Sequence, residues 1–219
     1  IDLRKNEAIL NEEKIELDSL KDRQTQIPNW LVLLRKQICN DLRIEEEDLP
    51  FAGELLKVKE EETEWEGAVE RLLHDFGISL IVPKDHFRTV SRYVNSQRMY
   101  SEGRGRKLTC LEANIENRDN YRKQLEEDSV VSKIDIKPET AFYSWVETYL
   151  HKSFGDYACV DIEDLQHISF GVTKQGTIKN SKIRYVKDDR QQITDRRNFI
   201  LGWSNIEKIK ALEETIVEL

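Results

Sequence analysis

The chain has 219 residues, of which 35% are charged, and its formal net charge is −8. This length is enough for a hydrophobic core without disulfide bonds. The excess of acid argues against a chain that coats nucleic acid over its whole surface, but it allows local basic patches. Residues 43–66 hold ten acidic and three basic residues, whereas residues 174–190 hold six basic and two acidic ones.

The cysteine spacing, the apolar runs and the start of the chain indicate in which compartment the protein is found. Cys39, Cys110 and Cys159 show no CxxC spacing, which predicts reduced, buried thiols and no zinc site. No apolar run approaches the roughly 20 residues of a membrane span. The chain opens at Ile1 without a signal sequence. We therefore expect an excised segment of a longer cytosolic protein that has no membrane partner.

Both ends of the chain carry apolar residues at the spacing of a coiled coil, which places them along one seam of a helix. Each end is too short to form a stable solitary coil. We predict that residues 1–25 and 204–219 pair with each other, antiparallel, as the cut ends of longer arms. Two ordinary amphipathic surface helices are the alternative. The predicted seam residues are Leu3, Leu10, Leu17, Ile209, Leu212, Ile216 and Leu219.

Residues 26–113 alternate between helix and strand patterns. Prolines favour the first turn of a helix, glycines favour its end, and short apolar runs between them indicate strands. In chain order we predict a helix from Pro28, a strand at 54–59, a helix capped by Thr63 and ended by Gly77, a buried strand at 78–82, a helix after Pro83, a Gly/Arg loop at 101–106 and a strand at 107–112.

Residues 129–203 repeat this order after a polar connector at 114–128. Leu73-His74 precedes Phe76-Gly77, and Leu150-His151 precedes Phe154-Gly155, so the two glycines lie 155 − 77 = 78 residues apart. The second half has strand patterns at 131–136, 157–160 and within 171–186, with helices from Pro138 and through Leu165 and Ile168. Alternating strands and helices predict a mixed α/β fold, with two tandem subdomains between the two coil ends.

Motifs for catalysis are absent from the sequence. The segment 103–107 lacks the GxxxxGK[ST] phosphate loop, and neither GxSxG nor HExxH occurs. His74 and His151 occupy equivalent repeat positions, which favours a structural role. We therefore predict no enzyme site, no metal and no cofactor in this segment. Asp188, Asp189 and Asp195 could suggest a metal, but the interleaved Lys and Arg residues favour a salt-bridge network.

Two basic segments are candidates for contact with DNA phosphates, because guanidinium and ammonium groups bind phosphate oxygens. One is the Gly/Arg loop, and the other is a predicted hairpin around Gln175-Gly176. The alternatives are a solvated turn and a charged strand edge that prevents aggregation; both stay open. The candidate residues are Arg104, Arg106, Lys107, Lys179, Lys182 and Arg184.

The arrangement of coil, two α/β halves and returning coil resembles the hinge of SMC proteins. It is most similar to the JetC family, the SMC-related subunits of Wadjet plasmid-defence systems and relatives of the MukB and MksB condensins. The sequence departs from that family at 99–106. The segments that carry the resemblance are Ile27-Pro28, Leu34-Arg35, Cys39, 49–55, 65–71, 66–82, 173–179, 187–190, 195–197, Leu201-Gly202-Trp203 and Asn205.

The resemblance implies a homodimerisation domain that joins two SMC-like chains in the bacterial cytoplasm. ATP and Mg are expected at head domains outside this segment, and kleisin-like, tandem-winged-helix and nuclease subunits are expected partners in a DNA loop-extruding complex. A DNA-binding module and an enzyme with an unrecognised site are the competing functions. The candidate interface residues, chosen on edge strands and at glycines, are Leu108, Thr109, Leu111, Gly171, Gly176, Ile178 and Ile183.

Overall fold

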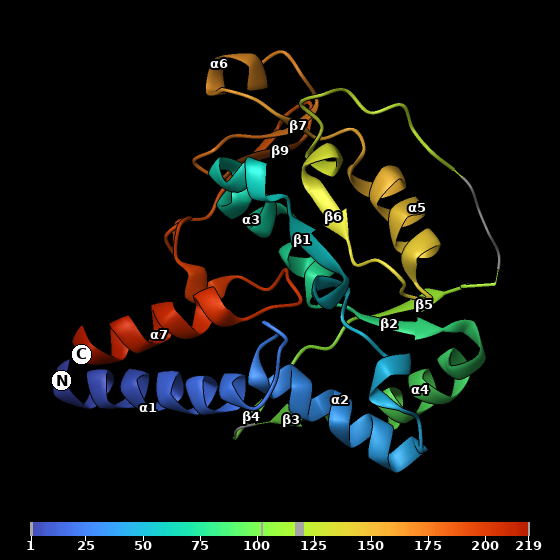
Figure 1. Ribbon diagram of the computed structural model, residues 1–219, viewed down its shortest axis with the longest axis vertical. Helices are drawn as coiled ribbons and strands as arrows, with labels where there is room; N and C mark the ends of the chain where they lie inside the picture. Colours follow the sequence, from blue (N-terminus) through green and yellow to red (C-terminus); the bar gives the residue numbers. More distant parts are fainter. Residues whose placement is uncertain (1, 102, 117–120, 219) are drawn as a thin grey trace.

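The first and last helices of the computed structural model lie side by side. The structure describes residues 2–101, 103–116 and 121–218. Helices α1 (Asp2–Lys21) and α7 (Ile206–Glu218) run together, and both chain ends lie at the same end of the molecule (Figure 1). Leu17, Leu20 and Leu212 are buried between them. The predicted antiparallel pairing of the two ends is confirmed.

The other described residues of the predicted seam are less buried than Leu17 and Leu212. Ile209 and Ile216 are partly buried against the same cluster, and Leu10 is half-buried. Lys21 and Glu213 form an ion pair of 3.1 Å across the two helices. The predicted seam positions 3 and 219 fall outside the residues whose side chains are described.

The first half contains the predicted alternation with three local differences. The predicted strand at 54–59 shrinks to β1, because 52–55 forms a 3-10 turn. Thr63 caps no helix, since a 3-10 turn spans Glu60–Trp65 before α3 begins. The Gly/Arg loop contains a small hairpin, β3–β4. The elements are α2 (Asn29–Leu42), β1 (Leu56–Val58), α3 (Glu66–Gly77), β2 (Leu80–Pro83), α4 (Lys84–Ser96), β3 (Tyr100–Ser101), β4 (Arg104–Gly105) and β5 (Cys110–Ala113).

The second half follows the same order with a shorter second helix. The helix expected from Pro138 begins only at Tyr143, and the one expected through Ile168 ends at Leu165. The elements are β6 (Ile134–Ile136), α5 (Tyr143–Phe154), β7 (Ala158–Cys159), α6 (Ile162–Leu165), β8 (Phe170–Val172), β9 (Thr177–Ser181) and β10 (Arg184–Lys187).

The sheets show how the two halves are joined. β1 and β6, the first strands of the two halves, pair antiparallel; β2 pairs parallel with β5, and β7 pairs parallel with β8 in the sheet β10-β9-β8-β7. The isolated bridges Phe51↔Leu80 and Ser129↔Ala158 are equivalent, because 129 − 51 and 158 − 80 are both 78. The repeat seen in the sequence is therefore also present in the structure.

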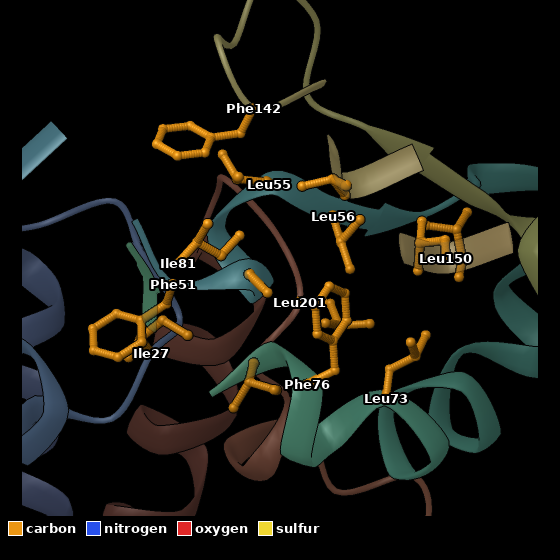
Figure 2. Close-up of a cluster of buried hydrophobic side chains, with 14 of the residues drawn as sticks. Ile27, Phe51, Leu55, Leu56, Leu73, Phe76, Ile81, Phe142, Leu150 and Leu201 are labelled. Carbon is orange, nitrogen blue, oxygen red and sulfur yellow. The ribbon is translucent and has the colours of Figure 1, made fainter. Parts of the chain in front are cut away.

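One hydrophobic core runs through both halves (Figure 2). The ring of Phe76 on α3 stacks on Tyr149 of α5 with 4.4 Å between centroids. Leu73 and Leu150 from the two halves are both buried, as is Leu201 from the segment that leads into α7. Cohesion between the halves comes from this shared core.

The cysteines and the membrane expectation can be checked against the structure. Burial raises the pKa of the Cys39 and Cys110 thiols to about 11 and that of Cys159 to about 12, so all three are poor nucleophiles near neutral pH. Among the described residues, none of the helices is both long and apolar enough to cross a membrane.

Candidate dimerisation edges and arm junction

Strands β5 and β10 each have one edge without a strand partner among the described residues. β5 pairs only with β2, and β10 pairs only with β9. The opposite edges are partly covered, because Phe51 bridges to Leu80 in β2 and Ser129 bridges to Ala158 in β7. β5 in the first half and β10 in the second half therefore each leave one edge open, and β1 and β6, which pair only with each other, leave one edge each as well. Open edges present unpaired backbone N–H and C=O groups to a further strand.

The interface candidates on these edges differ in accessibility. Leu108 and Leu111 are half-buried against the core, and the Thr109 carbonyl accepts a hydrogen bond from the Leu80 N–H. Ile183 lies in the two-residue turn between β9 and β10 and is 92% exposed. Ile178 instead lies on the inner strand β9, where it pairs with Val172 and Val186 and packs on the core.

The two candidate glycines serve the packing of their own chain. A Cβ on Gly171 would come within 2.8 Å of the Leu165 side chain. Gly176 has φ +79°, and a Cβ there would lie 2.6 Å from the Arg71 guanidinium. Each glycine therefore has a packing reason within its own chain, and its predicted place at an interface stays a prediction.

The six DNA candidates do not form one surface. Lys179 is buried, and its Nζ donates hydrogen bonds of 3.1 Å to the carbonyls of Leu165 and Gln166 at the end of α6. Its ammonium is thus withdrawn from solvent and is unsuited to bind phosphate. Lys182 and Arg184 are exposed at the β9–β10 turn, whereas the β3–β4 hairpin lies beside α2, at the opposite end of the view from β9 (Figure 1).

The β3–β4 hairpin is engaged with the first two helices. Arg104 forms an ion pair of 2.8 Å with Glu12 on α1, and the Arg106 guanidinium lies 4.7 Å from the centroid of the Trp30 ring on α2. Arg104 and Lys107 are both exposed. The hairpin therefore braces the base of the arm, a role that its sequence did not reveal.

An exposed row of cations on α4 was missed in the sequence. Lys84, Arg88 and Arg92 follow one another at four-residue spacing, so they share one face of the helix. All three are exposed, and within the described part of the chain they form no ion pair. The sequence analysis predicted this helix after Pro83 but not its exposed cations, which the four-residue spacing identifies.

The predicted salt-bridge network at 187–197 is present. Asp188 pairs with Arg190 at 2.5 Å, Asp189 pairs with Lys187, and Asp195 pairs with Arg197 at 2.7 Å. The hydrogen bonds from Arg190 hold the pKa of Asp188 below its ordinary range. In the described ranges no group of three His, Cys, Asp or Glu side chains could hold a metal ion.

Residues 199–205, which we call the strap, connect the body to α7 through buried hydrogen bonds. The buried Glu70 carboxylate of α3 accepts bonds of 3.0 Å from the N–H groups of Ile200 and Leu201. Gln26 Nε2 donates a bond of 2.7 Å to the Leu201 carbonyl. Burial raises the pKa of Glu70 to about 8. The strap is thereby bonded to α3 through Glu70 and to the segment before α2 through Gln26.

Glycines allow the strap to approach the body closely. The Gly202 N–H donates to the Gly53 carbonyl at 2.9 Å. Gly202 has φ +140°, which L side chains rarely adopt, and a Cβ on Gly53 would lie 2.5 Å from the Ile200 carbonyl oxygen. Both positions therefore require glycine.

Lys208 and Asn205 join the strap to the first arm helix. Lys208 Nζ is buried and donates to the carbonyls of Gln26 at 2.7 Å and Phe199 at 3.1 Å. Asn205 Nδ2 donates to the Leu20 carbonyl at 2.7 Å. Burial lowers the pKa of Lys208 to about 8. Both arm ends and the body therefore meet in one buried polar junction.

Comparison with known proteins defines the fold. No family model and no curated protein match the sequence. A structure described as the folded elbow of cohesin matches 96% of this chain and 29% of that chain, at 15% identity and a TM-score of 0.57. The SMC hinge domain of Geobacillus stearothermophilus, described as an asymmetric dimer, matches 99% of this chain and 91% of that chain, at 15% identity and a TM-score of 0.50. The chain thus spans less than a third of the cohesin chain but nearly all of the bacterial domain, and it has the fold of an SMC hinge.

Proposed function

We propose that this segment is the hinge of an SMC-like chain and that it joins two copies of that chain at the tips of their arms. The observation that carries the proposal is the geometry of the body. α1 and α7 leave it side by side (Figure 1), and the edges of β5 in its first half and of β10 in its second half are open. The Geobacillus domain with the same fold is described as a dimer.

A twofold dimer uses both open edges. In such a dimer β5 of one copy faces the β9–β10 hairpin of the other, and the same contact occurs twice because the interface is isologous. Strand addition at an open edge supplies backbone hydrogen bonds, while side chains supply specificity. The segment itself is proposed to be non-catalytic, with ATP and Mg bound at head domains elsewhere in the parent chain.

Substitution of Ile183 tests the dimer without disturbing the core. We expect the unsubstituted chain to have the mass of two copies in light scattering and the Ile183→Glu variant to have the mass of one, because a charge would be placed in the interface. Ile206→Glu is the matched control, since Ile206 is 69% exposed on α7. Ile178→Glu is unsuitable, because that side chain packs on the core.

The outcome separates the alternatives. A monomeric unsubstituted chain at every concentration would contradict the hinge proposal for this segment. A dimer that survives Ile183→Glu, with the circular dichroism spectrum unchanged, would move the interface away from the β9–β10 turn.

The finer proposal is that the parent chain is the SMC-related subunit of a Wadjet-type plasmid-defence complex in the bacterial cytoplasm. Its support is the JetC-like residues, several of which make the junction: Arg35 binds Glu54, and Leu201 and Asn205 bind the arm base. The kleisin-like, tandem-winged-helix and nuclease subunits would then act with it. In cells that carry all these subunits, Ile183→Glu in the full chain should abolish the exclusion of a small circular plasmid.

DNA contact is the second candidate function, and the cation row on α4 favours it. In the row of Lys84, Arg88 and Arg92 the first and last cations are eight residues apart, about 12 Å along the helix axis. Such a row can follow a phosphate backbone without reading its sequence. We therefore propose the outward face of α4 for the DNA contact in place of the Gly/Arg loop, because Arg104 and Arg106 of that loop contact α1 and α2.

Charge reversal tests the DNA contact. We expect the triple variant Lys84→Glu, Arg88→Glu and Arg92→Glu to lose affinity for a short DNA duplex and to lower the salt slope of binding by about one for each cation that touches a phosphate. A control with the same change of charge at Lys14, Lys59 and Lys137 should retain most of the affinity. Equal loss in the two variants would indicate a general charge effect and no α4 site.

A further inference from the structure

A groove of about 350 Å³ lies beside the open edge of β5, between that strand and α5. We call it the β5–α5 groove. Its apolar walls come from Leu111 on β5 and from Trp145 and Tyr149 on α5, which stack with 5.2 Å between ring centroids. Glu112 and Ser144 lie on its polar side. The groove therefore combines an apolar floor with a charged rim next to a strand that has an open edge.

The β9–β10 turn of the same chain has the complementary shape. Ser181 pairs with Arg184, so Lys182 and Ile183 form a two-residue turn. Such turns favour Asn, Asp and Gly, whereas β-branched residues are poorly suited to them. Ile183 is nevertheless almost completely exposed, at 92%. Neither the turn nor the core of its own chain accounts for an isoleucine at this position.

The charges of the two surfaces are also complementary. Residues 182–184 of the turn contain Lys182 and Arg184 and no acidic residue. On the groove, Glu112 is exposed, and its carboxylate forms no ion pair with the described residues. Lys152, also on the groove, lies over the ring of Tyr121 with 5.5 Å to the centroid.

We propose that Ile183 of one copy inserts into the β5–α5 groove of a second copy, with Arg184 beside Glu112. The proposal rests on the proposed hinge function and names the contact that would hold the dimer. Each chain carries one turn and one groove, so a twofold dimer contains the contact twice. The two open edges and the two complementary surfaces are then used by the same association.

Cross-linking between singly substituted copies tests the contact. An Ile183→Cys chain and a Ser144→Cys chain are co-expressed with different affinity tags, and the mixed dimer is treated with a short bismaleimide. We expect a covalent dimer that carries both tags. A chain with Ile206→Cys in place of Ile183→Cys is the matched control, and the unsubstituted chain reports any reaction of the native cysteines.

The result distinguishes the contact from the hinge proposal. A mixed dimer seen by light scattering that gives no more covalent product than the control would overturn the Ile183 contact and leave the hinge function intact. A monomeric mass in the same sample would overturn both.

A charge swap tests the second half of the proposal. Glu112→Arg and Arg184→Glu should each raise the dimer dissociation constant about tenfold, and the double variant should return it to within a few-fold of the original value. Additive weakening in the double variant would show that the two side chains do not face each other.

Discussion

Replacing Glu70 with Gln is expected to remove a pH dependence from the stability of the fold. Glu70 is buried and has a pKa of about 8, against an ordinary value of 4.5. The folded protein thus binds this proton more tightly than the unfolded chain does. Its stabilising contribution is complete below pH 4.5 and is lost as the pH rises through 8, by about 5 kcal/mol at most, since each pKa unit corresponds to about 1.4 kcal/mol.

Lys208 acts in the opposite direction in a higher range of pH. Its pKa is lowered from 10.5 to about 8. The contribution of this lysine to stability is complete above pH 10.5 and is lost as the pH falls through 8. In a chain that has both groups, the contribution of the junction to the free energy of unfolding should therefore be smallest near pH 8.

Urea unfolding between pH 5 and pH 8 measures the effect. The difference in the free energy of unfolding between the unsubstituted chain and Glu70→Gln should shrink steadily as the pH rises. Glu207→Gln, at an exposed position on α7, should give a curve parallel to that of the unsubstituted chain. Parallel curves for Glu70→Gln as well would mean that Glu70 does not take up a proton on folding, and the argument for a neutral buried carboxyl would fail.

The hydrogen bonds of the strap decide how a force on the second arm helix reaches the body of a hinge. The strap is held by Glu70 on α3, by Gln26 beside α2 and by the Gly53 carbonyl. A pull on α7 is therefore transmitted directly to the core and not through a flexible linker. Neutralising or ionising Glu70 changes how firmly the second arm is attached to the body.

Periodicity predicted the parts of the fold that repeat. Leu17 and Leu212 follow heptad spacing, and the Gly77 and Gly155 motifs recur at the distance that also separates the structural bridges. Such patterns are visible because burial on one face of an element imposes a regular spacing. The α/β alternation and the paired arm ends were accessible by this route.

Contacts between distant segments were not predictable from spacing. The sequence around Lys179 is that of an exposed basic strand. In the structure the end of α6 covers this lysine, and its ammonium donates to two carbonyls there. Glu70 and the strap are 130 residues apart, as the bond to Ile200 shows. A single sequence gives no sign of such partners, because a buried charged residue looks like an exposed one until its surroundings are known.

Arg35 gives the second large effect, because its guanidinium neutralises a carboxylate beneath α2. Arg35 Nη1 lies 2.6 Å from Glu54 Oε2, and the same oxygen accepts a bond of 2.8 Å from the Phe51 N–H. Arg35 is buried, and its guanidinium lies 5.2 Å from the centroid of the Phe51 ring. We expect Arg35→Leu to lower the free energy of unfolding by about 3–5 kcal/mol, because it leaves a poorly solvated carboxylate without its partner.

A second substitution should restore much of that loss. In the double variant Arg35→Leu and Glu54→Gln the amide keeps an acceptor for the Phe51 N–H and removes the uncompensated charge, so the urea midpoint should move back toward that of the unsubstituted chain. Lys36→Leu, on the exposed side of the same helix, should change the free energy by no more than about 0.5 kcal/mol. If the double variant is no more stable than Arg35→Leu, the loss comes from packing around Phe51, and the ion pair does not fix α2 to the body.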